Sequence, residues 1–228
     1  MLIGGLEKTS LLDYPDKISC IIFTYGCNLR CPYCHNPELV IDNIDKDVRP
    51  EYVLEFLKER IGKLDGVVIT GGEPLIQEDI LQFMEQIKKI GYSIKLDTNG
   101  LLPDKLQQAI DKKLVDYIAM DIKYPKAEYL SKTGIKDIED RITKSIKIIK
   151  KSHLPYEFRT TYVKGIHTMK SAESICKMIK GCRLYYIQNF RSGKSIDNTL
   201  DATNSFTQEE LQEILAIAQK YIKNAYIR

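Results

Sequence analysis

The sequence lacks the features that would place it outside ordinary globular proteins. Its longest apolar run, residues 214–218, is far shorter than the roughly 20 residues needed to cross a membrane. The first residues show no charged-then-apolar signal pattern, so we expect a cytoplasmic protein. The 34 basic residues barely outnumber the 31 acidic ones, and the net charge of +3 is too small and too evenly spread to indicate nucleic-acid binding. We therefore expect neither a membrane nor a nucleic-acid partner.

Linkers, low-complexity stretches and abrupt changes of composition are also missing. With 43% hydrophobic and 29% charged residues, the chain has the composition of a globular protein and not of a disordered one. Its 228 residues suit one domain, because α/β barrels of about 200–250 residues commonly form a single unit. We predict a single domain over residues 1–228.

Short apolar segments alternate with helical patterns from residue 19 onward, as expected of parallel strands buried on both faces. The predicted strands are Ser19–Thr24, Gly66–Thr70, Ser93–Asp97, Asp116–Asp121, Tyr156–Tyr162 and Leu184–Phe190. In the first helix, Val53, Leu57 and Ile61 share one face, and Pro50 suits its first turn. The pattern predicts an α/β fold, either an open sheet or a partial barrel.

The length of the repeating region favours the partial barrel. Six βα units occupy residues 19–222, whereas a complete barrel of eight units needs roughly 250 residues. Residues 1–18 are predicted to be an N-terminal extension packed on the barrel. The expected architecture is thus a partial (β/α)6 barrel with parallel strands.

Three of the six cysteines, Cys27, Cys31 and Cys34, lie close together directly after the first predicted strand. Such closely spaced thiolates on one loop can hold a metal centre. A disulfide would use only two of them and is unexpected in a reducing compartment. A structural zinc site needs four ligands, and His35 is poorly placed for this beside Cys34. Iron–sulfur clusters are also held by thiolates, and three thiolates on a four-iron cluster leave one iron open for chemistry.

Polar groups follow the ends of the next strands. The second strand runs into Gly71-Gly72-Glu73-Pro74, whose glycines let the backbone approach a ligand and whose carboxylate can accept from an ammonium group. Asp97 and Asp121 end the third and fourth strands, and Arg159 lies inside the fifth, where burial requires an anionic partner. Turns and helix caps could explain each group alone. Their shared placement favours one site, because ligands of parallel α/β folds bind at the carboxyl ends of strands.

The spacing C-x3-C-x2-C, with Tyr33 before the last cysteine, resembles the signature of the radical S-adenosylmethionine superfamily. In that superfamily the three cysteines hold a [4Fe–4S] cluster, and the amino and carboxylate groups of S-adenosylmethionine chelate the open iron. Four motifs narrow the resemblance to the glycyl-radical-enzyme activating branch, which includes pyruvate formate-lyase activating enzyme. They are Cys34-His35-Asn36, Gly71-Gly72-Glu73-Pro74, Asp97-Thr98-Asn99-Gly100 and Asp121-x-Lys123.

Other motifs are most similar to anaerobic ribonucleoside-triphosphate reductase activating proteins. They are Gly4-Gly5-Leu6-x-Lys8-Thr9-Ser10, Asp13-Tyr14-Pro15 and Gln188-x-Phe190-Arg191. The sequence departs from the formate-lyase activator at the end of the sixth strand, where that protein has a histidine and this one has Gln188 or Asn189.

The resemblance implies roles for individual residues. Cys27, Cys31 and Cys34 would hold the cluster, and Tyr33 would lie near the adenine. The residues implied to contact S-adenosylmethionine are Tyr33, Asn36, Gly72, Glu73, Asp97, Asp121, Lys123 and Arg159. Asp97, Thr98 and Asp121 could also hold a monovalent cation. No side chain is implied to act as an acid or base, since the cofactors carry the chemistry. Cys20, Cys176 and Cys182 are predicted to be packing residues.

The implied activity is generation of a glycyl radical on a partner enzyme. The reduced cluster would cleave S-adenosylmethionine, and the resulting 5′-deoxyadenosyl radical would take hydrogen from a glycine Cα. The resemblance favours anaerobic ribonucleotide reductase as partner and an electron donor such as flavodoxin or ferredoxin. Alternatives are activation of pyruvate formate-lyase or another glycyl radical enzyme, a radical enzyme acting on a small molecule or nucleotide, and a non-catalytic iron–sulfur or zinc scaffold.

Overall fold

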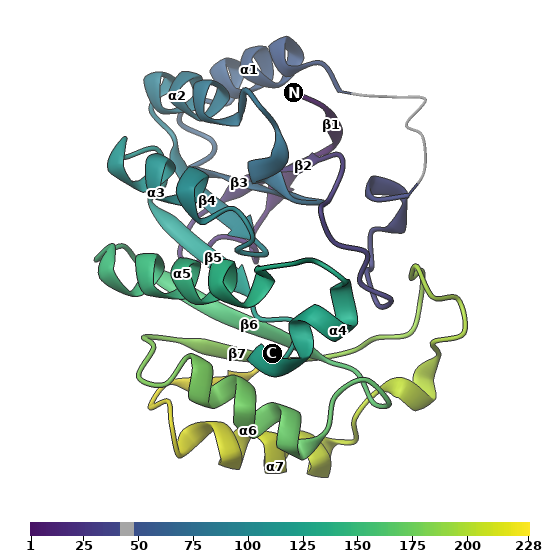
Figure 1. The fold of residues 1–228 in the computed structure, drawn as a ribbon. Helices are drawn as coiled ribbons and strands as arrows, with labels where there is room; N and C mark the ends of the chain where they lie inside the picture. The colour runs from purple at the N-terminus through teal and green to yellow at the C-terminus, as the bar shows by residue number, and fades with distance from the viewer. Residues whose placement is uncertain (42–47) are drawn as a thin grey trace. The chain divides into compact units, whose positions relative to one another are not determined.

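The computed structural model describes residues 1–41 and 48–228 and contains an eight-stranded sheet in the order β1 to β8 (Figure 1). The strands are β1 (Ile3–Ser10), β2 (Ser19–Thr24), β3 (Gly66–Gly71), β4 (Ser93–Thr98), β5 (Tyr117–Asp121), β6 (Tyr156–Tyr162), β7 (Tyr185–Asn189) and β8 (Ala225–Ile227). β2, β3 and β4 pair in parallel, as do β6, β7 and β8, whereas β1 runs antiparallel to β2. Over the described residues the sheet is not closed, and the predicted α/β fold with an incomplete, mostly parallel barrel is confirmed.

Seven α-helices and four short 3-10 turns connect the described strands. The helices are α1 (Pro50–Glu59), α2 (Ile80–Ile90), α3 (Pro103–Asp111), α4 (Tyr129–Thr133), α5 (Ile138–Lys151), α6 (Met169–Met178) and α7 (Gln208–Gln219). The 3-10 turns are η1 (Pro37–Leu39), η2 (Pro74–Ile76), η3 (Lys126–Glu128) and η4 (Ala202–Asn204). Among the described residues, no helix is both long and apolar enough to cross a membrane.

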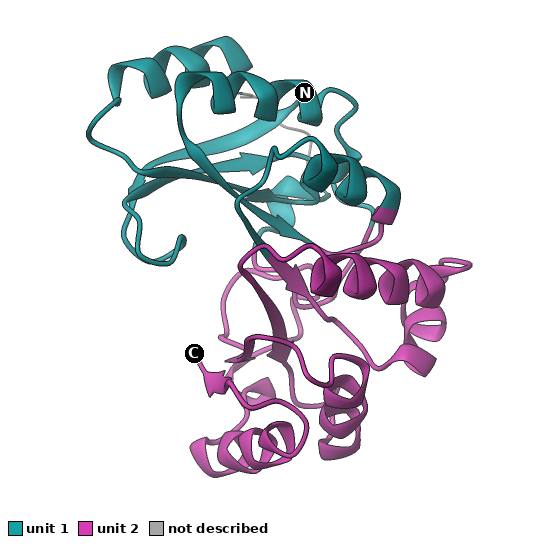
Figure 2. Cartoon of the chain, turned by 90° about the vertical axis from the view of Figure 1, so that its left-hand side faces the viewer, with its two compact units in different colours: residues 1–28, 36–98, 104–118 teal, residues 29–35, 99–103, 119–228 magenta. Residues whose placement is uncertain are grey.

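Close contacts divide the chain into two compact units (Figure 2). The first comprises residues 1–28, 36–98 and 104–118, and the second comprises residues 29–35, 99–103 and 119–228. The single domain expected from the sequence remains a prediction. The division assigns Cys27, Glu73 and Asp97 to the first unit and Cys31 and Asp121 to the second.

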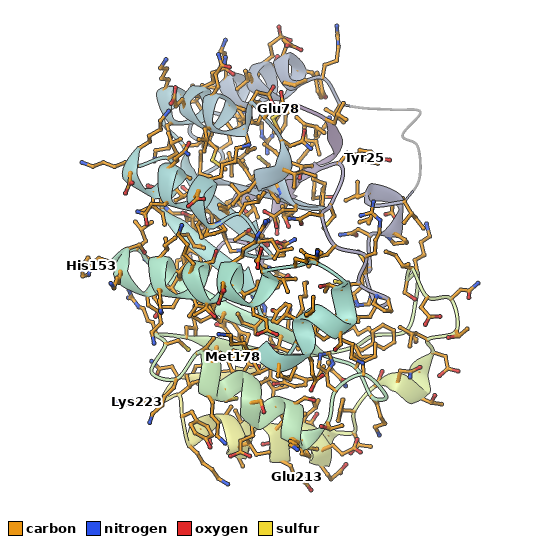
Figure 3. All side chains as sticks on the ribbon, viewed as in Figure 1. Tyr25, Glu78, His153, Met178, Glu213 and Lys223 are labelled. Atoms are coloured by element: carbon orange, nitrogen blue, oxygen red, sulfur yellow. The ribbon has the colours of Figure 1, made fainter. Side chains whose placement is uncertain are left out.

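Local sequence signals explain several element boundaries. In α2, Ile80, Met84 and Ile87 are buried at helical spacing, and Gly91 ends the helix with a left-handed φ of 112°. Thr207 begins α7 with a capping box, because its side chain accepts from Glu210 N while the Glu210 side chain accepts from Thr207 N. The exposed polar face of α7 carries Glu213, whose side chain projects outward (Figure 3).

The structure corrects the sequence prediction at two places. Within the N-terminal extension, residues 1–18, the structure adds a strand that the sequence did not predict: β1 pairs antiparallel with β2, and its Gly4-Gly5 pair gives little strand signal. Ile61 does not share the apolar face of α1: the helix ends at Glu59, and 61% of the Ile61 surface is exposed. Pro50 does occupy the first turn of α1, as predicted.

The core of the first unit includes a cluster of two tyrosines and two aliphatic side chains. Tyr14 packs with Ile21, Val68 and Tyr117, and the two tyrosine ring centroids lie 6.0 Å apart. Val68 is paired in the sheet with Lys95, so this apolar group and a lysine side chain share one layer of the sheet. The predicted packing residues Cys20, Cys176 and Cys182 are all buried, as expected.

Candidate functional site

The cysteine loop directly follows β2. All three candidate ligands, Cys27, Cys31 and Cys34, are reduced and partly exposed, which leaves their sulfur atoms available to a metal centre. Cys34 N donates to Cys31 O at 3.0 Å, so one tight turn holds these two cysteines in the second unit. No three His, Cys, Asp or Glu side chains of the described residues converge as they would around a single metal ion. A four-iron cluster does not require such convergence, because each thiolate binds a different iron.

The electrostatic surroundings of Cys31 act on its thiol in both directions. Burial raises the pKa of the Cys31 thiol, and the nearby Lys123 ammonium opposes that rise. Thiols must lose their proton to bind iron, so a fixed positive charge beside the sulfur favours the bound form. The donor set of this loop therefore fits an iron–sulfur cluster.

A further segment of the second unit supports the cysteine turn. Asp197 N donates to Pro32 O at 2.8 Å, and the His35 ring stacks on Phe190 with centroids 5.5 Å apart. The loop after β7 thus contacts the chain before Cys34, at Pro32, and after it, at His35. The sequence analysis missed this support, because nothing in the composition of residues 190–200 indicates where the loop lies.

The Gly-Gly-Glu-Pro turn lies against the backbone that leads into Cys27. Gly72 N donates to Thr24 O at 2.9 Å, and Glu73 N donates to Gly26 O at 2.8 Å. A Cβ added to Gly72 would lie 1.9 Å from Gly26 O, which is far inside the contact distance. In this structure, the glycine therefore serves the close approach of two backbone segments, in addition to any approach to a ligand.

Gly72→Ala is expected to lower the free energy of unfolding by about 1–3 kcal/mol or more, because the new Cβ must displace the backbone at Gly26. Urea unfolding measures this loss. Gly193→Ala is the matched control, since no atom lies within 4 Å of the added Cβ; its change should stay within about 0.5 kcal/mol. Equal stability of the two variants would contradict the backbone contact.

Buried carboxylates end the strands of the first unit. Glu73 is 1% exposed, and its Oε1 accepts from Thr98 Oγ1 at 2.8 Å and from Leu75 N at 3.2 Å. Asp97 binds the Lys95 ammonium, with 2.5 Å between Nζ and Oδ1. The structure thus brings the predicted Glu73 together with Thr98 and gives Asp97 a cationic partner. Lys95 was missed by the sequence analysis, although the reasoning applied to Arg159 also applies to a lysine inside an apolar strand.

Asp121, Lys123 and Arg159 form a charge triad in the second unit. Arg159 Nε donates to Asp121 Oδ1 at 2.8 Å, and Lys123 Nζ donates to Oδ2 at 2.9 Å. The anionic partner predicted for Arg159 is therefore confirmed. Burial alone would raise the pKa of Asp121, but the two cations outweigh it and hold that pKa well below its usual range. The carboxylate is fixed in its charged form with both oxygens engaged.

Tyr33 belongs to a buried aromatic group and not to an open surface. Its ring is 3% exposed and packs edge-on against Tyr124 and His167, with centroids 6.5 and 5.9 Å away. His167 Nδ1 accepts from Val163 N, so its Nε2 carries the proton and donates to Lys123 O at 2.8 Å. This neutral histidine fixes the backbone of the residue that carries the ammonium of the triad.

The remaining candidates differ in how strongly they are held. Asn36 is partly buried and precedes η1, where its carbonyl accepts from Leu39 N at 3.1 Å. Asn189 has a structural role, because its side-chain amide donates a hydrogen bond to Phe206 O and accepts one from Phe206 N. Gln188 and Asn189 are the two residues that stand where the formate-lyase activator has a histidine. The Asn189 side chain bridges to Phe206, and the Gln188 side chain does not.

A protein-family model matches the part of the chain that contains the cysteine loop, the Gly-Gly-Glu-Pro turn and the charge triad. The model of the radical SAM superfamily matches residues 21–179, which is more than half of the chain. The chain belongs to the radical SAM superfamily. Radical SAM enzymes use a [4Fe–4S] cluster and S-adenosylmethionine, and these are the cofactors of this enzyme.

Two relatives and one solved structure are similar to this radical SAM chain. A Methanocaldococcus jannaschii protein with the provisional name glycyl-radical enzyme activating enzyme is 34% identical and covers 100% of this chain and 95% of its own length. Pyruvate formate-lyase-activating enzyme of Clostridium pasteurianum is 32% identical over 54% of this chain and 52% of its own. Streptococcus suis SuiB bound to its precursor peptide SuiA covers 91% of this chain and 48% of its own, with 14% identity and a TM-score of 0.70, and so shares the fold.

Proposed function

We propose that this radical SAM enzyme generates a glycyl radical on a partner enzyme. The end-to-end match to the Methanocaldococcus jannaschii activating-enzyme relative, which leaves almost none of either chain unaligned, carries the proposal. Pyruvate formate-lyase-activating enzyme supports it over about half of the chain. Three of the four motifs of the activating branch begin at strand ends, where ligands of parallel α/β folds bind, and the fourth, Cys34-His35-Asn36, lies in the loop that follows β2.

The proposal assigns Cys27, Cys31 and Cys34 as the cluster ligands. The residues proposed to contact S-adenosylmethionine are Tyr33, Asn36, Gly72, Glu73, Asp97, Asp121, Lys123 and Arg159. When bound, the two cofactors supply a 5′-deoxyadenosyl radical that takes hydrogen from a glycine Cα of the partner. The chain itself binds and orients the cofactors and excludes water from the radical.

The charge triad is suited to orienting a zwitterionic ligand. Asp121 holds the Arg159 guanidinium and the Lys123 ammonium in fixed positions, so a ligand carboxylate would meet preorganised positive charge and cost little side-chain entropy. Glu73 is buried with one oxygen positioned by Thr98 and Leu75, which suits recognition of an ammonium group. Because the Tyr33 ring is buried, we propose that the Tyr33 backbone, which the ring holds in place, lies beside the adenine.

We further propose anaerobic ribonucleotide reductase as the partner and a flavodoxin or ferredoxin as the electron donor. The opening Gly-Gly-Leu-x-Lys-Thr-Ser motif and the Asp13-Tyr14-Pro15 turn support this partner. Tyr14 of that turn is 3% exposed within the core of the first unit, so this part of the motif maintains the fold. A cluster with an open iron needs a reducing compartment, and the proposal therefore includes a cytoplasmic location.

Anaerobic mixing of the reconstituted enzyme, S-adenosylmethionine, a strong reductant and a candidate anaerobic ribonucleotide reductase tests the activity. We expect a glycyl radical doublet in the EPR spectrum, with about one 5′-deoxyadenosine formed per radical because one hydrogen is abstracted per cleavage. A pyruvate formate-lyase added in parallel separates the two partners. Cleavage of S-adenosylmethionine without a doublet on any candidate protein would support the small-molecule alternative, and zinc without iron would support the scaffold.

A further inference from the structure

Lys95 and Asp97 form a nearly buried ion pair on β4. The Lys95 side chain is 2% exposed and the Asp97 side chain 13% exposed, and 2.5 Å separates Nζ from Oδ1. Residues two apart on a strand point to the same face, so the pair runs along the strand toward its carboxyl end. The ammonium therefore lies directly behind a carboxylate proposed to line the cofactor pocket.

The surroundings of Lys95 give no other obvious reason for a charged residue. Its partner in the sheet is Val68, which is 1% exposed and packs with Tyr14, Ile21 and Tyr117. An apolar side chain would fill this layer without the cost of desolvating an ammonium group. The position of the lysine is explained by the need for a positive charge next to Asp97.

In the first unit, Glu73 and Asp97 are two acidic side chains close to strand ends, and Lys95 is paired with one of them. A metal cation at Asp97 would have to share that carboxylate with an ammonium group that is already bound to it.

We propose that the Lys95 ammonium is a built-in monovalent cation for Asp97, in the place where the resemblance suggested a bound sodium or potassium ion. The inference rests on the proposed assignment of Asp97 to the pocket. An ammonium group and a potassium ion carry the same single positive charge and are similar in size, and the lysine ammonium is a compact point charge. The protein therefore needs no alkali metal ion at Asp97, and Lys95 is a positioning residue for that carboxylate.

Thermal unfolding of the cluster-free protein in potassium chloride and in tetramethylammonium chloride, at matched ionic strength, tests this proposal. Tetramethylammonium is too large and too poor a hydrogen-bonding partner to replace the lysine. The wild-type Tm should be the same in both salts. Lys95→Met keeps the length of the side chain but removes the charge, and in tetramethylammonium its Tm should fall by roughly 6–20 °C. Potassium should restore more than half of that loss.

Lys88→Met is the matched control. Lys88 pairs with Asp116 at 2.8 Å in the same unit, but its side chain is 29% exposed and that of Asp116 is 38% exposed. Water can replace this lysine, so its loss should be small and equal in the two salts. Thallium(I) nitrate, observed by thallium NMR, provides a direct probe: Lys95→Met should bind the ion in competition with potassium, and the wild type should not.

Two results would overturn the proposal. Equal destabilisation of Lys95→Met in both salts would make the lysine a structural residue only, and potassium-competed thallium binding by the wild type would show an open metal-cation site. If Lys95→Met does not fold in tetramethylammonium, recovery of folded protein in potassium supports the proposal and failure in both salts refutes it. All measurements use cluster-free protein without a partner, so their failure is distinct from failure of the proposed activity.

Discussion

Cys31→Ala protein, reconstituted anaerobically with iron and sulfide, is expected to lack the visible absorbance of a [4Fe–4S] cluster. It should form no 5′-deoxyadenosine above background under strong reductant. The proposed cluster has only three protein thiolates, and the loss of one leaves two irons without a protein ligand. The Lys123 ammonium near Cys31 favours its thiolate, which is the form that binds iron. Iron content, absorbance and product formation measure the effect.

Cys182→Ala is the matched control for that experiment. Cys182 is 6% exposed, lies in the same unit as Cys31 and is not a proposed ligand. Its replacement should cost packing free energy but leave iron content and cleavage of S-adenosylmethionine unchanged. A full complement of iron in Cys31→Ala, or loss of iron in Cys182→Ala, would contradict the assignment of Cys31 as a cluster ligand.

The sheet was predictable because burial on both faces leaves a simple pattern. Ser19–Thr24 and Tyr156–Tyr162 have the bounds that their apolar and β-branched residues indicated. Three other predicted strands differ by one residue at one end, and Leu184–Phe190 is one residue too long at each end. β1 and β8 escaped prediction because they lie at the edges of the sheet, where only part of each strand is buried. Edge strands need less apolar surface and so carry a weaker sequence signal.

The candidate site was predictable in its residue types but not in its internal contacts. The spacing of the cysteines predicts a shared metal centre, and an arginine inside an apolar strand predicts an anionic partner. Arg159 has that partner in Asp121. The close approach of Gly72 to Gly26 and the support of Pro32 by Asp197 depend on loops distant in the sequence. Such contacts follow from the folded backbone and leave no local pattern.

Asp121→Asn is expected to destabilise the protein by about 1.5–3 kcal/mol at pH 7, because two hydrogen bonds between charged groups are lost at a site that is only partly open to water. The substitution removes the carboxylate that Arg159 and Lys123 share, although Glu157 remains 3.8 Å from the Arg159 guanidinium. We also expect weaker binding of S-adenosylmethionine, because both cations lose the group that fixes their positions. Urea unfolding and the KM for S-adenosylmethionine measure the two effects.

The pH dependence distinguishes this charge effect from a packing effect. The pKa of Asp121 is lower in the folded protein than in the unfolded chain, so its contribution to stability is fully present above the unfolded value of about 3.9 and is lost as the pH falls toward the folded value. The difference between wild type and Asp121→Asn should therefore be constant from about pH 5 to 8 and narrow below about pH 4.

Glu85→Gln supplies the control for a carboxylate whose loss should matter little. Glu85 pairs with Lys112 at 3.1 Å, and both side chains are well exposed, so water and salt screen the pair. Its replacement should change stability by less than about 1 kcal/mol. If Asp121→Asn behaves like Glu85→Gln, then Asp121 is not the anion that holds Arg159 and Lys123. If instead the gap between wild type and Asp121→Asn persists unchanged below pH 4, the loss comes from the shape of the substituted amide and not from its missing charge.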